Sequence, residues 1–333
     1  MNLKYNYVVL SWVFSSSNIN EDYYYICLKD LEGIDGVIVN HEALQERPKW
    51  LRYLYKLHHY PLLNSTLKLP FKELWYPYVF KNTFKDDKPI CFICIRYPSS
   101  RYLKYLKSRF PNCKVVVMCR DLLKTHRAAY DAYTKEGVYD YWMSYDEEES
   151  KKYGFPHFDE FESKIEIPIS NDYPISDVFF AGRAKDRLTR LIDIYDRLEA
   201  MGINCLFYIV GVEKGKEIER KGIRYLTKQI SYYEMLRLSI NSKCILEINQ
   251  EGAEGYSSRF LEAVMFNKKL MTDNVYIKKS KFYKPEYIQF VNSDNFNADF
   301  LMDDSYEVDY HYNGEFSPLL RIEQIDAMLS KEA

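Results

Sequence analysis

The sequence has no run of about 18 consecutive apolar residues, which a membrane-spanning helix would need. Its first residues, MNLKYNYVVLSWVF, lack the charged start, the apolar stretch and the small-residue cleavage site of a secretory signal peptide. We therefore expect a cytoplasmic protein. Disorder is not indicated either, because 333 residues that are 47% apolar and 28% charged can bury a substantial core and favour two domains.

A disulfide framework and a zinc knuckle are also missing. The seven cysteines are odd in number and lie mostly in apolar, strand-like runs, which is typical of buried reduced thiols. Cys91 and Cys94 have a spacing found in zinc sites, but the surrounding PICFICIRY is a continuous strand-like run. We therefore expect neither a metal nor a redox role here.

The most informative stretch is residues 243–274. Its pattern predicts a buried strand (244–248), a polar loop with glycine (249–255), a helix capped by Ser257 or Ser258 and a second strand (269–272). Such a strand, loop, helix and strand form the repeating unit of a parallel sheet.

Polar residues of this loop and helix indicate an anion site. Gly255 lets a ligand approach the backbone, and the helix that follows offers unpaired amides and its positive dipole end. Arg259, in the first turn, can reach the same anion, and Glu262, one turn in, can accept hydrogen bonds from the two hydroxyls of a ribose. The alternative is an ordinary helix with a surface ion pair between Arg259 and Glu262.

The run EGYSSRFLEA, from Glu254 to Ala263, resembles the EGFG…LEA signature of GT-B glycosyltransferases, above all those encoded in bacterial capsule, lipopolysaccharide and exopolysaccharide loci. The resemblance extends over about residues 140–283. It implies that Glu254 lies by the transferred sugar and that Glu262 holds the ribose. Ser257 stands where the common form of the motif has a second glycine.

Strands and helices alternate on both sides of a proline-bearing boundary at residues 156–176, which predicts parallel, doubly wound sheets. With the resemblance, this implies an α/β GT-B fold with two Rossmann-like domains facing a central cleft. The expected parts are an acceptor-binding domain (1–165), a nucleotide-sugar-binding domain (176–317) and a C-terminal helix (318–333) packing back on the first. Within the first 40 residues, YYYICLKDL is interpreted as a strand.

A second group of candidates follows the predicted strand 177–181. Gly182 opens the backbone, and Arg183, Lys185 and Arg187 add mobile cations suited to a leaving nucleoside diphosphate. The arrangement is similar to the Gly-Arg…Lys loop of the same transferases. A tight turn with solvated cations is the alternative. By position in the family, Tyr225 lies on the strand that faces the nucleotide base.

In the N-terminal half, Asp121 stands at the carboxyl end of an apolar strand, and His126 follows on the next helix. Ligands collect at such strand ends, so either residue is a candidate base or acceptor-binding group if the enzyme inverts stereochemistry. A histidine on a helix surface is the alternative for His126.

Basic residues dominate residues 47–127, with 18 Lys or Arg against four acids. Their interleaving with aromatic residues predicts a peripheral contact with anionic membrane on the inner face. A solvated basic face is the alternative. Nucleic acid is not expected, because no nucleic-acid-binding motif is recognised.

These observations favour a glycosyltransferase of the hexosyl or a related type. It would move a sugar from a nucleotide-sugar donor to a hydroxyl of a bacterial surface glycan or a lipid-linked precursor. No Asp-x-Asp motif occurs, so we expect no metal and no other cofactor. Two alternatives stay open: a nucleotide-sugar epimerase or hydrolase of the same fold, and a non-catalytic partner subunit of another transferase.

Overall fold

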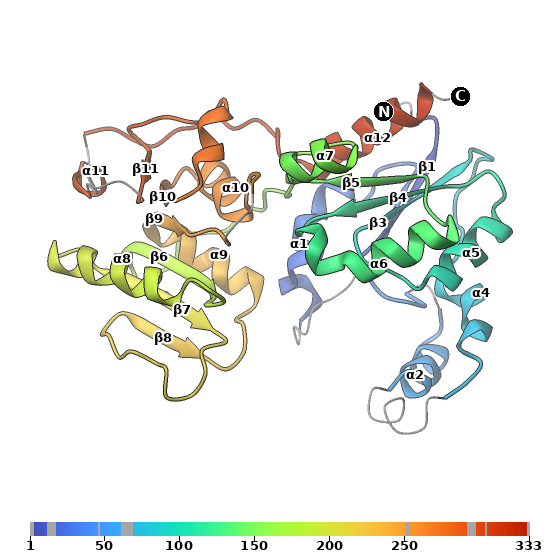
Figure 1. The fold of residues 1–333 in the computed structure, drawn as a ribbon, viewed down its shortest axis with the longest axis horizontal. Helices are drawn as coiled ribbons and strands as arrows, with labels where there is room; N and C mark the ends of the chain where they lie inside the picture. Colours follow the sequence, from blue (N-terminus) through green and yellow to red (C-terminus); the bar gives the residue numbers. More distant parts are fainter. Residues whose placement is uncertain are drawn as a thin grey trace. The chain divides into compact units, whose positions relative to one another are not determined.

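The computed structural model describes residues 3–11, 18–45, 47–60, 69–250, 254–291, 298–303 and 305–331. The described residues form two α/β units (Figure 1). Unit 1 draws on the ranges Met1–Ser15, Leu28–Phe158 and Pro318–Ala333, and unit 2 on Ser16–Cys27 and Asp159–Ser317. The chain thus leaves unit 1 after Phe158, within the proline-bearing stretch, and re-enters it at Pro318.

Unit 1 contains a five-stranded parallel sheet of order β2-β1-β3-β4-β5. Its strands are β1 (Asn6–Leu10), β2 (Val37–Asn40), β3 (Ile90–Cys94), β4 (Lys114–Cys119) and β5 (Tyr141–Ser144). Its helices are α2 (Lys49–His58), α4 (Tyr76–Val79), α5 (Ser100–Arg109), α6 (Leu123–Glu136), α7 (Glu147–Tyr153) and α12 (Pro318–Ser330), with 3-10 turns η2 (Lys29–Leu31) and η3 (Lys72–Trp75).

Unit 2 contains a six-stranded parallel sheet of order β11-β10-β9-β6-β7-β8. Its strands are β6 (Ser176–Arg183), β7 (Cys205–Val210), β8 (Ile223–Leu226), β9 (Ser242–Glu247), β10 (Lys269–Thr272) and β11 (Ile288–Phe290). Its helices are α1 (Tyr23–Cys27), α8 (Leu188–Ala200), α9 (Tyr232–Ile240), α10 (Ser258–Met265) and α11 (Asp299–Met302), with 3-10 turns η1 (Ile19–Glu21) and η4 (Val275–Lys279). The strand order reverses between β6 and β9.

The alternation expected from the sequence is therefore confirmed in both units, and local signals explain where several helices begin. The Ser231 hydroxyl accepts from the Glu234 amide and so caps α9. The Ser257 hydroxyl accepts from the Phe260 amide, which makes Ser257 the cap of α10. Asp146 caps α7 in the same way.

The predicted strand YYYICLKDL is wrong, because Tyr23–Cys27 forms α1 and Lys29–Leu31 a 3-10 turn. Asp22 begins the helix: its carboxylate accepts from the Tyr24 amide at 3.0 Å and its carbonyl from the Ile26 amide at 3.0 Å. The cap and the packing of α1 in unit 2 outweigh the strand preference of tyrosine and isoleucine.

The last helix, α12, is fastened to the beginning of unit 1. The Asp326 carboxylate accepts from the backbone amides of Lys4 and Tyr5, at 3.0 and 3.3 Å, and from the Tyr7 hydroxyl at 2.7 Å. Residues more than 300 positions apart are joined by these bonds.

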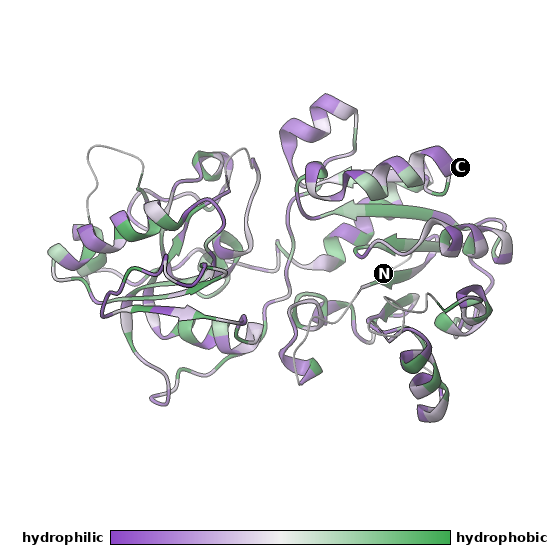
Figure 2. Cartoon of the chain, turned by 60° about the horizontal axis from the view of Figure 1, so that its bottom comes forward, coloured by the Kyte–Doolittle hydropathy of each residue, from purple (hydrophilic) through white to green (hydrophobic). Residues whose placement is uncertain are grey.

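Most strand residues are apolar and buried. The helices mix apolar and polar residues, as the colours of Figure 2 show. All seven cysteines are buried, and burial raises the pKa of the Cys94 thiol to about 12. In the part of the chain that the structure describes, no helix combines the length and the apolar character needed to cross a membrane.

Candidate functional site

The two strands at the order reversal of unit 2 part before they end. Residue pairing between β6 and β9 ends at Phe179 and Ile245, whereas β6 stays paired with β7 as far as Arg183 and Val210. A gap between the carboxyl ends of β6 and β9 therefore opens at the topological switch point, the usual ligand position in open parallel sheets.

Arg259 of α10 fills this position. One of its terminal nitrogens donates to the Ala181 carbonyl, and the guanidinium lies 5.2 Å from the centre of the Phe180 ring. A Cβ atom added at Gly182 would lie 2.6 Å from Nη2 of Arg259 and 3.2 Å from Cζ of Phe180. Glycine at 182 thus leaves room for the guanidinium at the end of β6. Two residues of the predicted diphosphate group, Gly182 and Arg259, are in contact.

Arg187 joins the two parted strand ends. It is buried, and its guanidinium donates to the carbonyls of Ile248, just past β9, and of Arg183, at the end of β6. Burial, and next the charge of Arg259, lower the pKa of Arg187 to about 10, so it stays charged at neutral pH. The sequence predicted a mobile cation at Arg187, whereas in the structure its guanidinium is held between the ends of β6 and β9.

A buried carboxylate lies under the start of α10. Glu247, the last residue of β9, is fully buried and accepts from the Ser257 hydroxyl and from the Thr272 hydroxyl. Burial raises the pKa of Glu247, although both hydroxyls and Arg259 favour the charged form. The hydroxyl of Ser257 is thus already committed to Glu247 and to capping.

Glu262 is buried rather than on the surface, with 1% of its area exposed. The alternative of a solvated surface ion pair with Arg259 is therefore wrong. Its Oε1 accepts from the Tyr232 hydroxyl at 3.0 Å, and within the described residues its Oε2 has no hydrogen-bond partner. Burial raises the pKa of Glu262 to about 7, against the opposing effects of Arg259 and Tyr232.

The other predicted residues near this point are exposed or structural. Arg183 and Lys185 are exposed, and Lys185 donates to Oε1 of Gln250 at 2.7 Å with a backbone φ of +46°. Gly255 is buried and its carbonyl accepts from the Asn274 side chain at 2.8 Å. Glu254 is exposed and follows residues 251–253, which lie outside the described ranges.

Tyr225 lies on β8, two strands away from β6, and its hydroxyl is committed to the Ile218 backbone, with which it makes two hydrogen bonds. It holds the loop before β8. Its predicted position beside the nucleotide base stays a prediction.

Asp121 and His126 belong to unit 1, just after β4 and inside α6. The His126 ring stacks on Tyr97 at 4.2 Å, and its backbone is non-helical, with φ −116° and ψ 15°. Burial lowers the pKa of His126, although Asp121 acts in the opposite direction, so a neutral imidazole is favoured at pH 7. The structure brings these two candidates together on the first unit.

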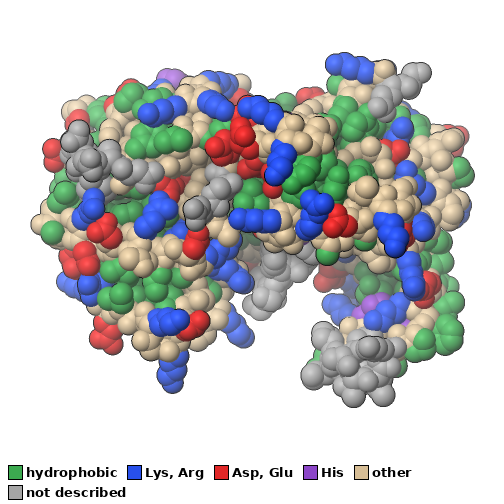
Figure 3. All heavy atoms as spheres, in the orientation of Figure 1, with side chains coloured by type: hydrophobic (Ala, Val, Ile, Leu, Met, Phe, Trp, Pro, Cys, Tyr) green, Lys and Arg blue, Asp and Glu red, His purple; other side chains and the backbone are tan. Residues whose placement is uncertain are grey.

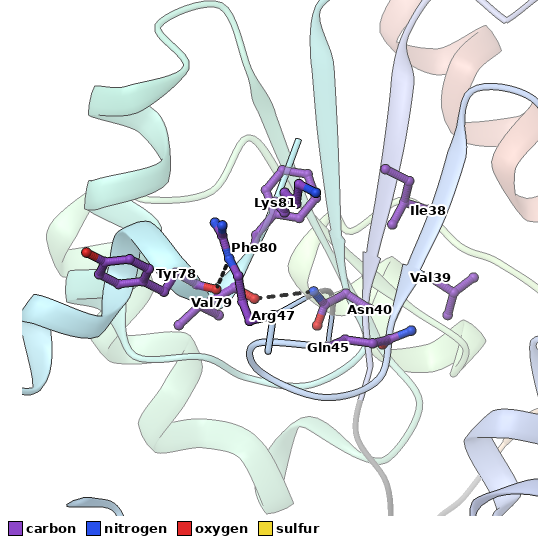
Figure 4. A pocket seen from close by; sticks show the side chains of 9 residues that line it. All are labelled: Ile38, Val39, Asn40, Gln45, Arg47, Tyr78, Val79, Phe80 and Lys81. Carbon is purple, nitrogen blue, oxygen red and sulfur yellow. Dashed lines mark hydrogen bonds between the residues drawn. The ribbon is translucent and has the colours of Figure 1, made fainter. Parts of the chain in front are cut away.

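A pocket of unit 1 lies at the end of β2 (Figure 4). Arg47 donates there to the carbonyls of Pro77 and Tyr78, and Asn40 to that of Val79. Most of its polar groups thus hold the walls of the pocket together. None of the predicted site residues lines it.

Four residues of the unit 2 site were missed from the sequence: Tyr23, Glu162, Tyr232 and Glu247. Glu247 had a signal, since an acid inside the apolar run CILEI must be buried with partners. The other three come from α1, from the segment after Phe158 and from α9, and only the fold brings them to α10. Among the described residues, no group of three or more His, Cys, Asp or Glu side chains has an arrangement that could hold a metal.

The sequence matches no protein family, and no curated protein matches it. Solved structures do show a likeness. Trehalose-6-phosphate synthase OtsA is 10% identical, with 82% of this chain and 86% of that chain covered and a TM-score of 0.46. Staphylococcus aureus MnaA with UDP is 10% identical, with 97% and 96% covered and a TM-score of 0.44. Pneumococcal O-GlcNAc transferase GtfA with UDP and GlcNAc is 11% identical, with 74% and 57% covered and a TM-score of 0.43.

This chain spans 50% of the matched chain in a GtfA/B complex. At such identities and TM-scores the likeness says nothing about activity. The architecture itself is plain: two units, each built on a parallel sheet, with a C-terminal helix returned to the first. The described residues thus form two doubly wound α/β units, as the sequence predicted.

Proposed function

We propose that unit 2 binds a nucleotide-sugar and that the chain transfers the sugar to a hydroxyl of a bacterial surface glycan or a lipid-linked precursor. One observation carries this proposal: the guanidinium of Arg259 lies on the end of β6 against Gly182, at the switch point of the sheet. A cation, a glycine and the start of α10 meet there, which suits a diphosphate.

In this proposal Arg259, Gly182 and the exposed Arg183 and Lys185 contact the diphosphate. Because the Ser257 hydroxyl is committed to Glu247, the α10 end contributes backbone amides, and Gly255 brings the loop close. Glu262 receives the ribose hydroxyls, Tyr225 faces the base, and Glu254, which is exposed, reaches the transferred sugar. Catalysis comes from stabilising the negative charge of the departing diphosphate.

We propose that this charge stabilisation needs no metal. If the enzyme inverts stereochemistry, Asp121 or His126 of unit 1 serves as the base. Transfer rates that are the same with and without a chelator would support the metal-free proposal, and a complete loss with rescue by Mg²⁺ would contradict it.

Calorimetry with UDP, GDP, CDP and dTDP tests donor binding directly. Binding of one of them, with a matching rise in melting temperature, supports the proposal. Binding of none would favour the non-catalytic partner subunit. Release of free sugar or its epimer from the donor without acceptor would favour the epimerase or hydrolase.

Gly182→Ala is expected to weaken nucleoside diphosphate affinity by roughly tenfold, since the added methyl displaces the Arg259 guanidinium and with it a charge-assisted hydrogen bond. In an Arg259→Ala background the same change should have little effect, because the displaced group is gone. Equal losses of affinity in both backgrounds, measured by calorimetry, would contradict the role given to this contact.

We also propose that unit 1 contacts anionic membrane through the α2 surface. It is defined as the exposed large apolar side chains of α2, of η3 and of the residue before η3: Trp50, Tyr53, Leu54, Leu57, Phe71 and Leu74. They are 44 to 70% exposed, an unusual set for one helix and the turn beside it. At 100° per residue the α2 members share one face, with Lys49, Arg52 and Lys56 adjacent to it. Trp75 fixes the turn to α2 by donating to His58 at 2.7 Å.

Aromatic and leucine side chains beside lysine and arginine suit a helix lying in a negatively charged lipid surface. Other Lys and Arg side chains are spread over the face seen in Figure 3, but the apolar members distinguish the α2 surface from a merely solvated basic face.

Trp50→Ser with Tyr53→Ser is expected to reduce binding to vesicles containing phosphatidylglycerol at least about tenfold, because two interfacial rings are lost. Ile169→Ser with Ile175→Ser, which changes exposed apolar residues of unit 2, is the matched control and should bind as the unchanged chain does. Cosedimentation measures both. Equal binding to neutral phosphatidylcholine vesicles, or a concentration-dependent dimer that the Trp50/Tyr53 variant abolishes, would contradict a lipid partner.

A further inference from the structure

Two buried glutamates and a half-buried tyrosine of unit 2 meet at one hydroxyl. Tyr232, the first residue of α9, lies within hydrogen-bond distance of Oε1 of Glu162 and, at 3.0 Å, of Oε1 of Glu262. Both glutamates are 1% exposed. Glu162 comes from the segment that follows Phe158, so three separate parts of the chain build the cluster.

Counting protons shows that the cluster cannot be fully ionised. A tyrosine hydroxyl has one hydrogen and can donate to one carboxylate only. Burial, and next the charges of Glu162 and Glu262, raise the pKa of Tyr232 far above its ordinary value, so the hydroxyl keeps its hydrogen. The second carboxyl can approach the tyrosine oxygen favourably only if it carries a proton of its own and donates it. One of the two glutamates is therefore a carboxylic acid.

The groups around the cluster do not by themselves decide whether Glu162 or Glu262 holds the proton, so a bound ligand can decide it. Burial opposes an ionised Glu262, Arg259 on α10 and the Tyr232 hydroxyl favour it, and Glu247 on β9 opposes it to a smaller extent. From α1, Tyr23 packs its ring edge-on against Tyr232 at 4.8 Å, and its hydroxyl lies 3.2 Å from that of Ser258. Oε2 of Glu262 has no hydrogen-bond partner within the described residues, so this atom still has accepting capacity.

We infer that Glu162 and Glu262 share one proton across the Tyr232 hydroxyl, and that a ribose diol bound at Glu262 fixes this proton on Glu162. The diol depends on the nucleotide binding proposed above. Its O–H groups are donors, and an ionised carboxylate accepts them most strongly. The Glu162 acid then donates to the tyrosine oxygen, the tyrosine donates to Oε1 of Glu262, and the diol donates to Oε2. Glu162 is thus a positioning residue that acts through Tyr232.

The first test uses the ligand-free chain. A carboxyl whose pKa is raised by folding holds its proton longer in the folded state, so stability is lost as pH rises from about 4.5 through about 7. The unchanged chain should show this loss, and Glu162→Gln and Glu262→Gln should each reduce it, because one carboxyl alone can ionise without facing another. If neither variant altered the dependence of the free energy of unfolding on pH, the shared proton would be overturned.

A second measurement needs no variant. Infrared spectroscopy of the unchanged chain at pH 6 should show the carbonyl band of a buried protonated carboxyl. After exchange into heavy water this band should remain, with its frequency lowered by the expected isotope shift. Its absence would overturn the shared proton even if a variant failed to fold.

The third test separates the two glutamates by nucleotide binding. The probes are the tightest binder among UDP, GDP and CDP and its 2′-deoxy form. Glu162→Gln, an uncharged mimic of the acid, should bind the ribonucleotide within about threefold of the unchanged chain and with a flatter pH profile, and Glu162→Ala should bind more weakly. Glu262→Gln should bind at least about tenfold more weakly and lose the preference for ribose over deoxyribose. Equal losses in both Gln variants would overturn the assignment of the proton to Glu162. No binding of any probe by the unchanged chain would overturn the proposed function and the ribose role, while the first two tests would still decide the shared proton.

Discussion

Replacing Arg259 with methionine is expected to lower the rate of sugar transfer by about 100- to 1000-fold, the range seen when one group that stabilises transition-state charge is removed. The guanidinium is already oriented by the Ala181 carbonyl and the Phe180 ring, so no reorganisation is needed as the diphosphate departs. Because charge grows on the leaving group during the reaction, the loss should appear mainly in kcat rather than in KM.

Two further variants make this result specific. Arg259→Lys should recover only part of the rate, because an ammonium cannot make the paired contacts of a planar guanidinium. Arg183→Met removes an exposed cation at the end of β6 and should cost much less. A rate that changes equally in Arg183→Met and Arg259→Met would mean that only the overall charge matters, and the proposed arrangement of the site would then be incorrect.

Replacing Arg187 with methionine is expected to lower the free energy of unfolding by about 2–5 kcal/mol, because two carbonyls, that of Ile248 buried, would lose a charged donor at once. These carbonyls belong to Arg183 and Ile248, on either side of the point where β6 and β9 part. Denaturant titration measures the change. Arg197→Met is the matched control on the same helix, where an exposed pair with Asp193 should contribute little. If the two variants were equally stable, the hydrogen bonds of Arg187 to the ends of β6 and β9 would not contribute to stability.

The strand and helix succession was accessible from the sequence because it depends on local signals. The apolar runs of β3 and β4, the capping box at Ser231 and the cap at Ser257 each lie within a few residues of the element they define. The same holds for Gly182 and Arg259: each was singled out by its own neighbours in the sequence, one after a strand and one in the first turn of a helix.

What the sequence could not show was which distant residues would meet. Nothing in the tyrosine-rich run at 23–27 indicates that it packs in unit 2, and the proline-bounded segment that carries Glu162 has no periodicity. Arg187 was recognised as a cation, but its burial depends on β9, about 60 residues later. The local sequence pattern therefore predicted the strands and helices that carry the site. The partners of Glu262 could be identified only from the folded structure.

The attachment of α12 to β1 has a consequence for biosynthesis. β1 leaves the ribosome before the rest of unit 1, but Asp326, which accepts from the amides of Lys4 and Tyr5, emerges some 320 residues later. Unit 2 is nearly continuous in the chain and can assemble during translation, while unit 1 cannot be completed until α12 has been made. Nascent chains stalled before α12 should therefore protect unit 2 from proteases earlier than unit 1.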